Sequence, residues 1–214
     1  MSTATELITT FELQVSDITE LSTSEELLIL NRINQRVCAQ RSWEFLKTSA
    51  SGTLAGSGAD GSYITIPADF SSFSENYLYT DNAVSAQNNA APKVIFMGAN
   101  YSPFFLVNYS DRRQYLGTTG YAFLDLANDK IVFTGTPELR TYDFDYIKTP
   151  PILTAGDTPP MPARFQDILV YGMAAEDSIL QLSPKATSYA NENRAMYEQY
   201  MLDMAYWNAQ LQLN

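Results

Sequence analysis

The chain has 214 residues, of which 45% are hydrophobic and 13% aromatic, and its 13 basic and 24 acidic residues leave a formal net charge of −11. This size and composition suit one globular domain, or a compact core with a large insertion, and exclude disorder throughout. The acidic balance argues against general binding to phosphate backbones, which needs clustered Lys and Arg. No apolar run reaches bilayer length, and residues 1–6 lack the features of a signal peptide. We therefore expect a soluble protein with no membrane partner that is not exported by its own sequence.

The N-terminal region predicts two helices. A short one is indicated by apolar residues at helical spacing, namely Leu7, Ile8, Phe11 and Val15. A second begins at Thr23-Ser-Glu-Glu26, where a hydroxyl is followed three residues later by a glutamate, the pattern of a capping box. Its apolar positions continue to Leu46, so we expect this helix to reach about Lys47.

Residues 49–61 are rich in Ser, Gly, Ala and Thr, which excludes a helix there. The glycine-rich run from Gly56 to Gly61 lies between residues 53–55 and 63–67, which have strand composition, so it predicts a hairpin turn. A phosphate cradle is disfavoured because no lysine follows at the P-loop spacing and no helix begins there.

Further strands are predicted through the middle of the chain, at residues 77–79, 93–97, 104–107, 121–126, 130–134 and 140–147. Residues 83–91 indicate an exposed loop, and residues 109–116 a short helix. Asn128 and Asp129 tolerate the positive φ of a tight hairpin turn. The last strand places its aromatic residues on one face. The middle of the chain is thus predicted to be antiparallel β, and the fold class α+β, a helical bundle with a β-rich insertion.

A proline-rich segment, residues 146–162, crosses from the last strand into two helices, because proline can join neither a sheet ladder nor a helix interior. The first helix has its small and apolar residues on one face: Phe165, Ile168, Gly172, Ala175, Ile179 and Leu182. The second is expected to begin at Ser183-Pro184 and to pack antiparallel on the first. Its stripe comprises Ala186, Ala190, Asn193, Tyr197, Tyr200, Met204, Trp207 and Leu211.

The last part of this second helix carries more apolar surface than one antiparallel neighbour covers. Aromatic and methionine side chains are enriched at protein interfaces, so we expect this end to dock on another subunit. A frayed terminus is the alternative. On the docking hypothesis, truncation after Tyr200 leaves the bundle folded. The predicted partner-binding residues are Tyr200, Met204, Tyr206, Trp207, Leu211 and Leu213.

The chain contains no histidine, which removes the commonest general base and metal ligand. Asp143 and Asp145 share a strand face, and with Asp125 they suggest a calcium site. A solvated strand face is the better interpretation, because nothing supplies six oxygen ligands. Ser183 and Lys185 have the spacing of a nucleophile and its base, but a helix cap explains the serine. We therefore expect no catalytic residue, no metal and no cofactor.

Isolated basic residues on an acidic chain usually pair with the chain's own carboxylates. We assign that role, in preference to anion binding, to Arg112, Arg113 and Arg140. The single cysteine, Cys38, lies in a helical pattern and is expected to be a buried small apolar residue.

Several segments resemble a known family in their order and spacing. They are Ala39-Gln-Arg-Ser-Trp43-Glu-Phe45-Leu46, Tyr63-Ile-Thr-Ile-Pro67-Ala-Asp69-Phe70, Asn128-Asp129, the strand from Tyr142 that leads into Lys148-Thr-Pro-Pro-Ile-Leu-Thr154, and Pro162-Ala-Arg-Phe165. This pattern resembles the head–tail connector (adaptor) proteins of tailed bacteriophages, including the tail tubular A type. Residues 71–120 show no family pattern.

The resemblance implies a helical bundle, residues 1–48 and 160–214, with a β-rich insertion, residues 49–159. It implies a structural virion protein without enzyme activity that forms a ring of twelve copies beneath the portal and lines the DNA channel. Its partners would be other copies, the portal, a downstream tail or nozzle protein and the passing DNA. A gatekeeper or tube-end protein is the first alternative, and a carbohydrate-binding or hydrolytic virion protein the second.

Overall fold

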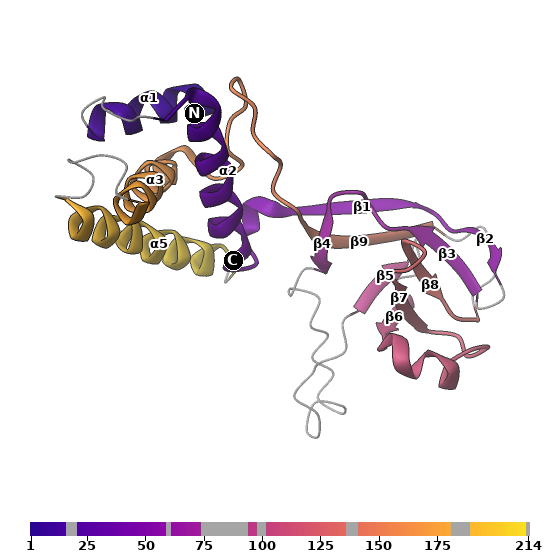
Figure 1. The fold of residues 1–214 in the computed structure, drawn as a ribbon. Coiled ribbons are helices and arrows are strands. Elements are labelled where there is room, and N and C mark those ends of the chain that lie inside the picture. The colour runs from indigo at the N-terminus through magenta and orange to yellow at the C-terminus, as the bar shows by residue number, and fades with distance from the viewer. Residues whose placement is uncertain are drawn as a thin grey trace. The chain divides into compact units, whose positions relative to one another are not determined.

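The structure is a computed structural model that describes residues 1–15, 21–58, 61–73, 94–97, 102–135, 141–180 and 189–212. The chain forms two compact units: a helical unit of residues 1–46 and 150–214, and a β unit of residues 47–149 (Figure 1). Helices gather in the first unit and strands in the second, so the predicted α+β class is confirmed. Residues 150–159, which we had assigned to the β-rich region from sequence, belong to the helical unit.

The two N-terminal helices are α1 (Ala4–Val15) and α2 (Thr23–Ala39). Helix α1 buries the predicted apolar residues. The capping box of α2 lies one residue earlier than predicted: Glu25 Oε2 accepts hydrogen bonds from Ser22 N at 2.8 Å and from Ser22 Oγ at 2.6 Å. These bonds satisfy a donor at the start of the helix that has no intrahelical partner.

Helix α2 ends at Ala39, so the predicted extension to Lys47 is wrong. The indole Nε1 of Trp43 donates to the Val37 carbonyl at 2.9 Å, and Gln40 N donates to the same oxygen. The last carbonyls of a helix have no partner within the helix and accept hydrogen bonds from other groups. The two bonds to the Val37 carbonyl therefore mark the end of α2. A 3₁₀ turn, η1 (Glu44–Leu46), follows and leads into strand β1 (Lys47–Thr53).

The proline-rich segment of residues 150–162, here called the strap, is tied to the first two helices. The side-chain amide of Asn31 bonds both backbone groups of Leu153. Asn31 Nδ2 donates to Leu153 O at 2.9 Å, and Leu153 N donates to Asn31 Oδ1 at 2.7 Å. Ala4 N also donates to Asp157 O at 2.8 Å. Side-chain and helix-end groups thus satisfy backbone groups of a segment that has no secondary structure of its own.

The strap leads through η3 (Ala163–Phe165) into α3 (Asp167–Leu180), and the last helix is α5 (Ala190–Gln212). The rings of Phe165 and Trp207 lie 5.5 Å apart, and those of Tyr171 and Tyr200 lie 5.6 Å apart. The first pair joins the start of the hairpin to the end of α5, so α3 and α5 are antiparallel, as predicted (Figure 1). The predicted cap at Ser183-Pro184 lies outside the described residues.

The described strands of the β unit form one sheet in the order β1-β9-β5-β6-β7-β8-β3-β2, with β4 also paired to β9. The predicted strand at 77–79 and the loop at 83–91 lie outside the described residues. The remaining bounds are β2 (Ala55–Gly58), β3 (Gly61–Thr65), β4 (Phe70–Phe73), β5 (Val94–Met97), β6 (Ser102–Leu106), η2 (Tyr109–Gln114), β7 (Tyr121–Asp125), β8 (Lys130–Phe133) and β9 (Thr141–Lys148).

The sheet is not wholly antiparallel, which corrects the prediction for the middle of the chain. Strands β6 and β7 are parallel, with Phe105 opposite Tyr121 and Leu106 opposite Ala122. Parallel neighbours need a crossover of about a dozen residues, and residues 107–120, which include η2, supply it. The predicted short helix at 109–116 is therefore this crossover element.

Two predicted hairpins are confirmed. Strands β7 and β8 are joined by a turn in which Asp129 has φ 51°. Strands β2 and β3 pair antiparallel, with Gly58 opposite Gly61. Gly61 has φ 135°, and a Cβ there would collide with the Phe133 carbonyl, so the backbone requires glycine on both counts.

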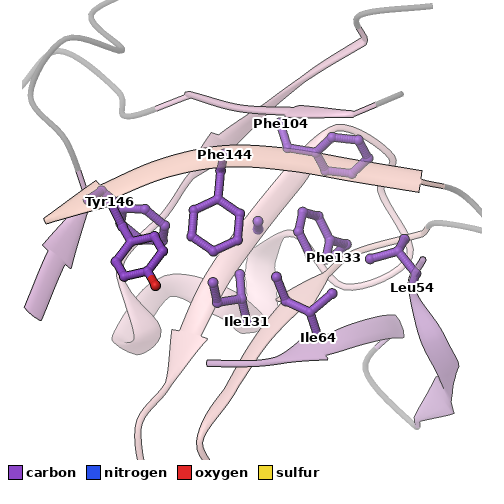
Figure 2. Close-up of a cluster of buried hydrophobic side chains, with 9 residues drawn as sticks. Leu54, Ile64, Phe104, Ile131, Phe133, Phe144 and Tyr146 are labelled. Atoms are coloured by element: carbon purple, nitrogen blue, oxygen red, sulfur yellow. The ribbon is translucent and has the colours of Figure 1, made fainter. Parts of the chain in front are cut away.

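The core of the β unit is an aromatic and aliphatic cluster. Phe144 of β9 and Ile64 of β3 both belong to it, although five strand spacings, about 24 Å in a flat sheet, separate β9 from β3. The sheet must therefore curve around the cluster, and Figure 2 shows the labelled side chains from several strands gathered into one group. The buried members are Leu54, Ile64, Phe73, Phe104, Ala122, Ile131, Phe133, Phe144 and Tyr146.

Candidate functional site

The end of α5 divides into a buried face and an exposed face. Met204 is completely buried and Met201 nearly so, while Tyr206 is 70% exposed and Leu202 63% exposed. Leu202 and Tyr206 are four residues apart, so they lie on the same side of the helix. This outward pair is large and apolar. Sequence analysis named only Tyr206 of the two, although the i, i+4 spacing was present in the sequence.

Three of the predicted docking residues are occupied within the helical unit: the buried Met204, and Trp207 and Tyr200, which pack on other rings. The ring of Trp207 packs on Phe165, and the guanidinium of Arg164 lies 4.9 Å from the Trp207 ring centroid. Tyr200 stacks on Tyr171. Burial raises the pKa of the Tyr200 hydroxyl above its ordinary value, with a further contribution from nearby carboxylates.

Beyond Tyr206 the helix still contributes to the core. Asn208 is 5% exposed; its Oδ1 accepts from Glu44 N at 2.7 Å, and its Nδ2 donates to Ser42 O at 3.2 Å. Truncation after Tyr200 would remove these bonds together with the buried Met204, so from the structure we expect the truncated bundle to be less stable than the sequence suggested. Leu211 is 43% exposed, and Leu213 lies outside the described residues.

A pocket of about 350 Å³ with charged walls lies between α2, α3 and α5 in the helical unit. Its carboxylates are already paired: Glu176 lies 3.2 Å from Arg36, and Glu198 lies 3.1 Å from Arg194. Gly172 and Ile33 form part of its wall. Both carboxylates that line this pocket among the described residues are therefore ion-paired.

The other candidate groups that the structure describes are paired or buried. The described residues contain no group of three or more His, Cys, Asp or Glu that could hold a metal ion. Asp145 lies 3.7 Å from Lys47 in an ion pair. Cys38 is buried, as predicted, and burial raises the pKa of its thiol to about 12, which keeps it protonated at neutral pH. Ser183, Lys185 and Arg140 lie outside the described residues.

The arginines of η2 do not follow the prediction. Arg112 Nη1 donates to Tyr109 O at 2.8 Å and its guanidinium lies over the Tyr109 ring, while Arg113 is exposed. In the part of the chain that the structure describes, neither arginine forms an ion pair with a carboxylate.

The same part of the chain has no helix long and apolar enough to cross a membrane.

A comparison with protein families matches residues 2–212 to a family described as SU10 adaptor protein. The match extends over both units and over the whole of α5. A comparison with curated proteins finds no match.

Proposed function

Because the chain belongs to the SU10 adaptor protein family of phage head–tail adaptors, we propose that it is a structural virion protein without enzyme activity. In this proposal it forms a ring of twelve copies beneath the portal, joins the capsid to the tail and lines the channel through which DNA leaves. It is made in the host cytoplasm and contacts the portal on one side and a downstream tail or nozzle protein on the other.

The observation that carries the docking part of this proposal is the outward face of α5. Leu202 and Tyr206 remain exposed although the opposite face of the same helix is fully packed. Tyrosine is enriched among residues that dominate binding energies at interfaces, and an exposed aromatic–aliphatic pair loses water when a partner covers it. We assign the portal contact to this face and to Leu211 near the helix end.

The charge of the chain supports the channel part of the proposal. With a net charge of −11, the chain repels phosphate on average. A channel wall of the same sign as DNA lets the strand pass without holding it, whereas clustered cations would bind the backbone.

The docking assignment is tested with the double variant Tyr206→Ala/Leu211→Ala. We expect binding to the portal of the same phage to weaken by about tenfold or more, since truncating central interface residues costs more than about 1–2 kcal/mol each. Leu28→Ala on α2 is the matched control, because Leu28 is 69% exposed and lies on another helix. Unchanged affinity in the double variant, with the fold intact by circular dichroism, would refute the assignment.

A gatekeeper or tube-end protein is the first alternative. The antiparallel pair of α3 and α5 favours the adaptor, because those tail components do not need a long C-terminal helical hairpin. A carbohydrate-binding or hydrolytic virion protein ranks below both. The exposed aromatic Tyr109 has an arginine against it rather than the paired carboxylates that glycoside hydrolysis uses.

A further inference from the structure

The crossover element η2 carries two arginines and one carboxylate, Asp111, so it has a small positive net charge on an acidic chain. Arg112 and Arg113 are the only adjacent pair of basic residues in the sequence. Beside them, Tyr109 is 44% exposed and Leu116 is 38% exposed. We call Tyr109, Arg112, Arg113 and Leu116 the η2 surface.

Contacts within the chain hold Arg112 and Tyr109 of this surface together. The guanidinium of Arg112 lies 3.7 Å from the centroid of the Tyr109 ring and is also tied to the Tyr109 carbonyl. The Tyr109 ring in turn packs on Phe123 of β7, with ring centroids 5.9 Å apart. An arginine held against an aromatic ring loses less side-chain freedom on binding than a free one. Tyr and Arg are also residue types enriched in interface hot spots.

A second surface of opposite charge lies in the same unit. The turn of residues 125–129, between β7 and β8, exposes Leu126 by 69% and carries two aspartates. Asp129 is exposed, and Asp125 Oδ2 accepts a hydrogen bond from Asn128 at 2.8 Å. The adjacent Lys130 lies over the ring of Tyr63 at 4.0 Å and forms no ion pair with either aspartate within the described residues.

The η2 surface lies along the first half of β7, where Tyr109 packs on Phe123, and the acidic turn follows the end of the strand. Tyr115, just after η2, packs on Tyr121 at the start of the strand, whereas the acidic turn begins at its last residue, Asp125. Among the described residues, no ion pair joins Arg112 or Arg113 to Asp125 or Asp129 within one copy. Their charges are complementary, and each carries an exposed apolar side chain beside the charge.

We infer that copies of the chain join head to tail through the β unit, with the η2 surface of one copy against the 125–129 turn of the next. Such a contact uses two different patches, and repeated contacts of this kind close into a ring when the rotation allows it. The inference rests on the proposed ring and names the surfaces that build it. We assign a second copy as the partner of the η2 surface, because the acidic turn of that copy offers both negative charge and apolar area. DNA is the less suitable partner, because the net charge of −11 repels it.

The first test reverses and then exchanges the charges in the full chain. R112E/R113E makes both surfaces acidic and should weaken assembly by about tenfold or more in sedimentation velocity. The turn variant L126K/D129N should weaken it as well. A chain that carries all four substitutions should regain assembly, because opposite charges face each other again. R41E/R194E is the control, since it makes the same charge change on exposed arginines of the helical unit.

A second test does not depend on charge reversal. L116C/L126C places one thiol on each surface, and Cys38 stays in place because it is buried. Oxidation of the assembly should link neighbouring copies into a ladder, while L116C or L126C alone should stop at dimers or monomers.

Both tests are run on the chain alone and after mixing with the portal protein of the same phage. Rings without a ladder, or rings that tolerate R112E/R113E, would overturn the inference and leave the proposed ring standing. Loss of assembly in R41E/R194E to the same extent would also overturn it, by showing a net-charge effect. Absence of rings under both conditions would contradict the proposed function itself.

Discussion

The helical unit and the β unit are held together in different ways. Among the described residues, the helical unit buries six polar or charged side chains, Glu26, Asn34, Gln166, Asp177, Asn193 and Asn208, whereas the β unit buries Ser62 and Thr134. The β unit fills its centre instead with four phenylalanines and their aliphatic neighbours. The alternation of apolar residues and the geometry of the turns set the register of a sheet, so its core can consist of apolar contacts alone. Packed helices lack that ladder, and directional hydrogen bonds can set their alignment.

The buried amides of the helical unit join segments that are far apart in the sequence. Asn193 Oδ1 accepts from Gln14 Nε2 at 3.0 Å, and Gln166 Oε1 accepts from Ser2 N at 2.8 Å. Asn208 of α5 bonds to the backbone of Ser42 and Glu44, which follow α2. A hydrogen bond forms only within a narrow range of distances and angles, whereas an apolar contact persists when two helices shift slightly along each other. The helical unit is therefore expected to be sensitive to the loss of single amides.

The two tryptophans allow the units to be followed separately. Trp43 and Trp207 both belong to the helical unit, and the chain has only these two. Tryptophan fluorescence thus reports the helical unit, while hydrogen exchange of β3, β8 and β9 reports the β unit.

The largest expected effect comes from the aromatic core. Phe133 is completely buried, so Phe133→Ala should destabilise the β unit by about 3–5 kcal/mol, through lost apolar contact and the cavity left behind. Hydrogen exchange in β3 and β8 should accelerate, while the urea transition reported by tryptophan fluorescence should shift much less. An equal shift in both probes would show that the two units unfold as one.

The strap tests whether single amides matter in the helical unit. Asn31→Leu removes both partners of the Leu153 backbone, and leaving such groups unsatisfied costs about 1–3 kcal/mol. Exchange of the Leu153 amide should accelerate, and the tryptophan-reported transition should move to lower urea. Gln35→Ala on the exposed side of the same helix is the control. A Leu153 amide that exchanges at the wild-type rate would contradict this account.

A tight helix contact should give a smaller loss. In Gly172→Ala the new Cβ would lie 2.5 Å from Ile33 Cγ2 and 3.2 Å from the Tyr197 ring. Overpacking costs about 1–3 kcal/mol, and the better helix propensity of alanine returns about 1 kcal/mol, so we expect a net loss of about 1 kcal/mol in thermal unfolding. Gly156→Ala is the control, because no atom lies within 4 Å of its added Cβ. A stabilised Gly172→Ala variant would rule out the close contact.

The smallest effect concerns Tyr146, whose hydroxyl donates to Asp69 Oδ1 at 2.8 Å. Burial, and then the bond to Asp69, raise the pKa of Tyr146 to about 12. Because the folded state favours the protonated phenol, this contribution is complete below about pH 10, the unfolded value, and is lost as pH rises through about 12. Tyr146→Phe should cost about 0.5–1.5 kcal/mol at pH 7, and less as the pH rises toward 12. A cost that stays constant up to pH 12 would contradict this linkage.

Local patterns predicted much of this fold, and contacts between distant residues account for the errors. The spacing of Leu7 and Phe11 predicted α1. Asn128 and Asp129 predicted the turn between β7 and β8. The end of α2 was missed because apolar spacing continues to Leu46, while the bond from Trp43 that closes the helix leaves no mark in the periodicity. The parallel pairing of β6 with β7 was missed for a similar reason, since strand composition does not reveal strand order.

The candidate docking site was predicted less completely than the fold. Sequence analysis located the apolar end of α5 but treated Met204 and Trp207 as available, and neighbours distant in sequence cover both. Asparagine is usually a surface residue, but Asn208 is buried. Tyr206 and Leu211 keep the exposure that the docking proposal needs.

The central claim, that the chain is a ring-forming adaptor on the portal, is tested most directly by negative-stain electron microscopy of the chain mixed with the portal protein of its phage. The account predicts a second ring stacked on one face of the portal, of the same rotational symmetry, that is absent from portal alone. Portal particles without added density, with the chain remaining monomeric in the same mixture, would contradict it.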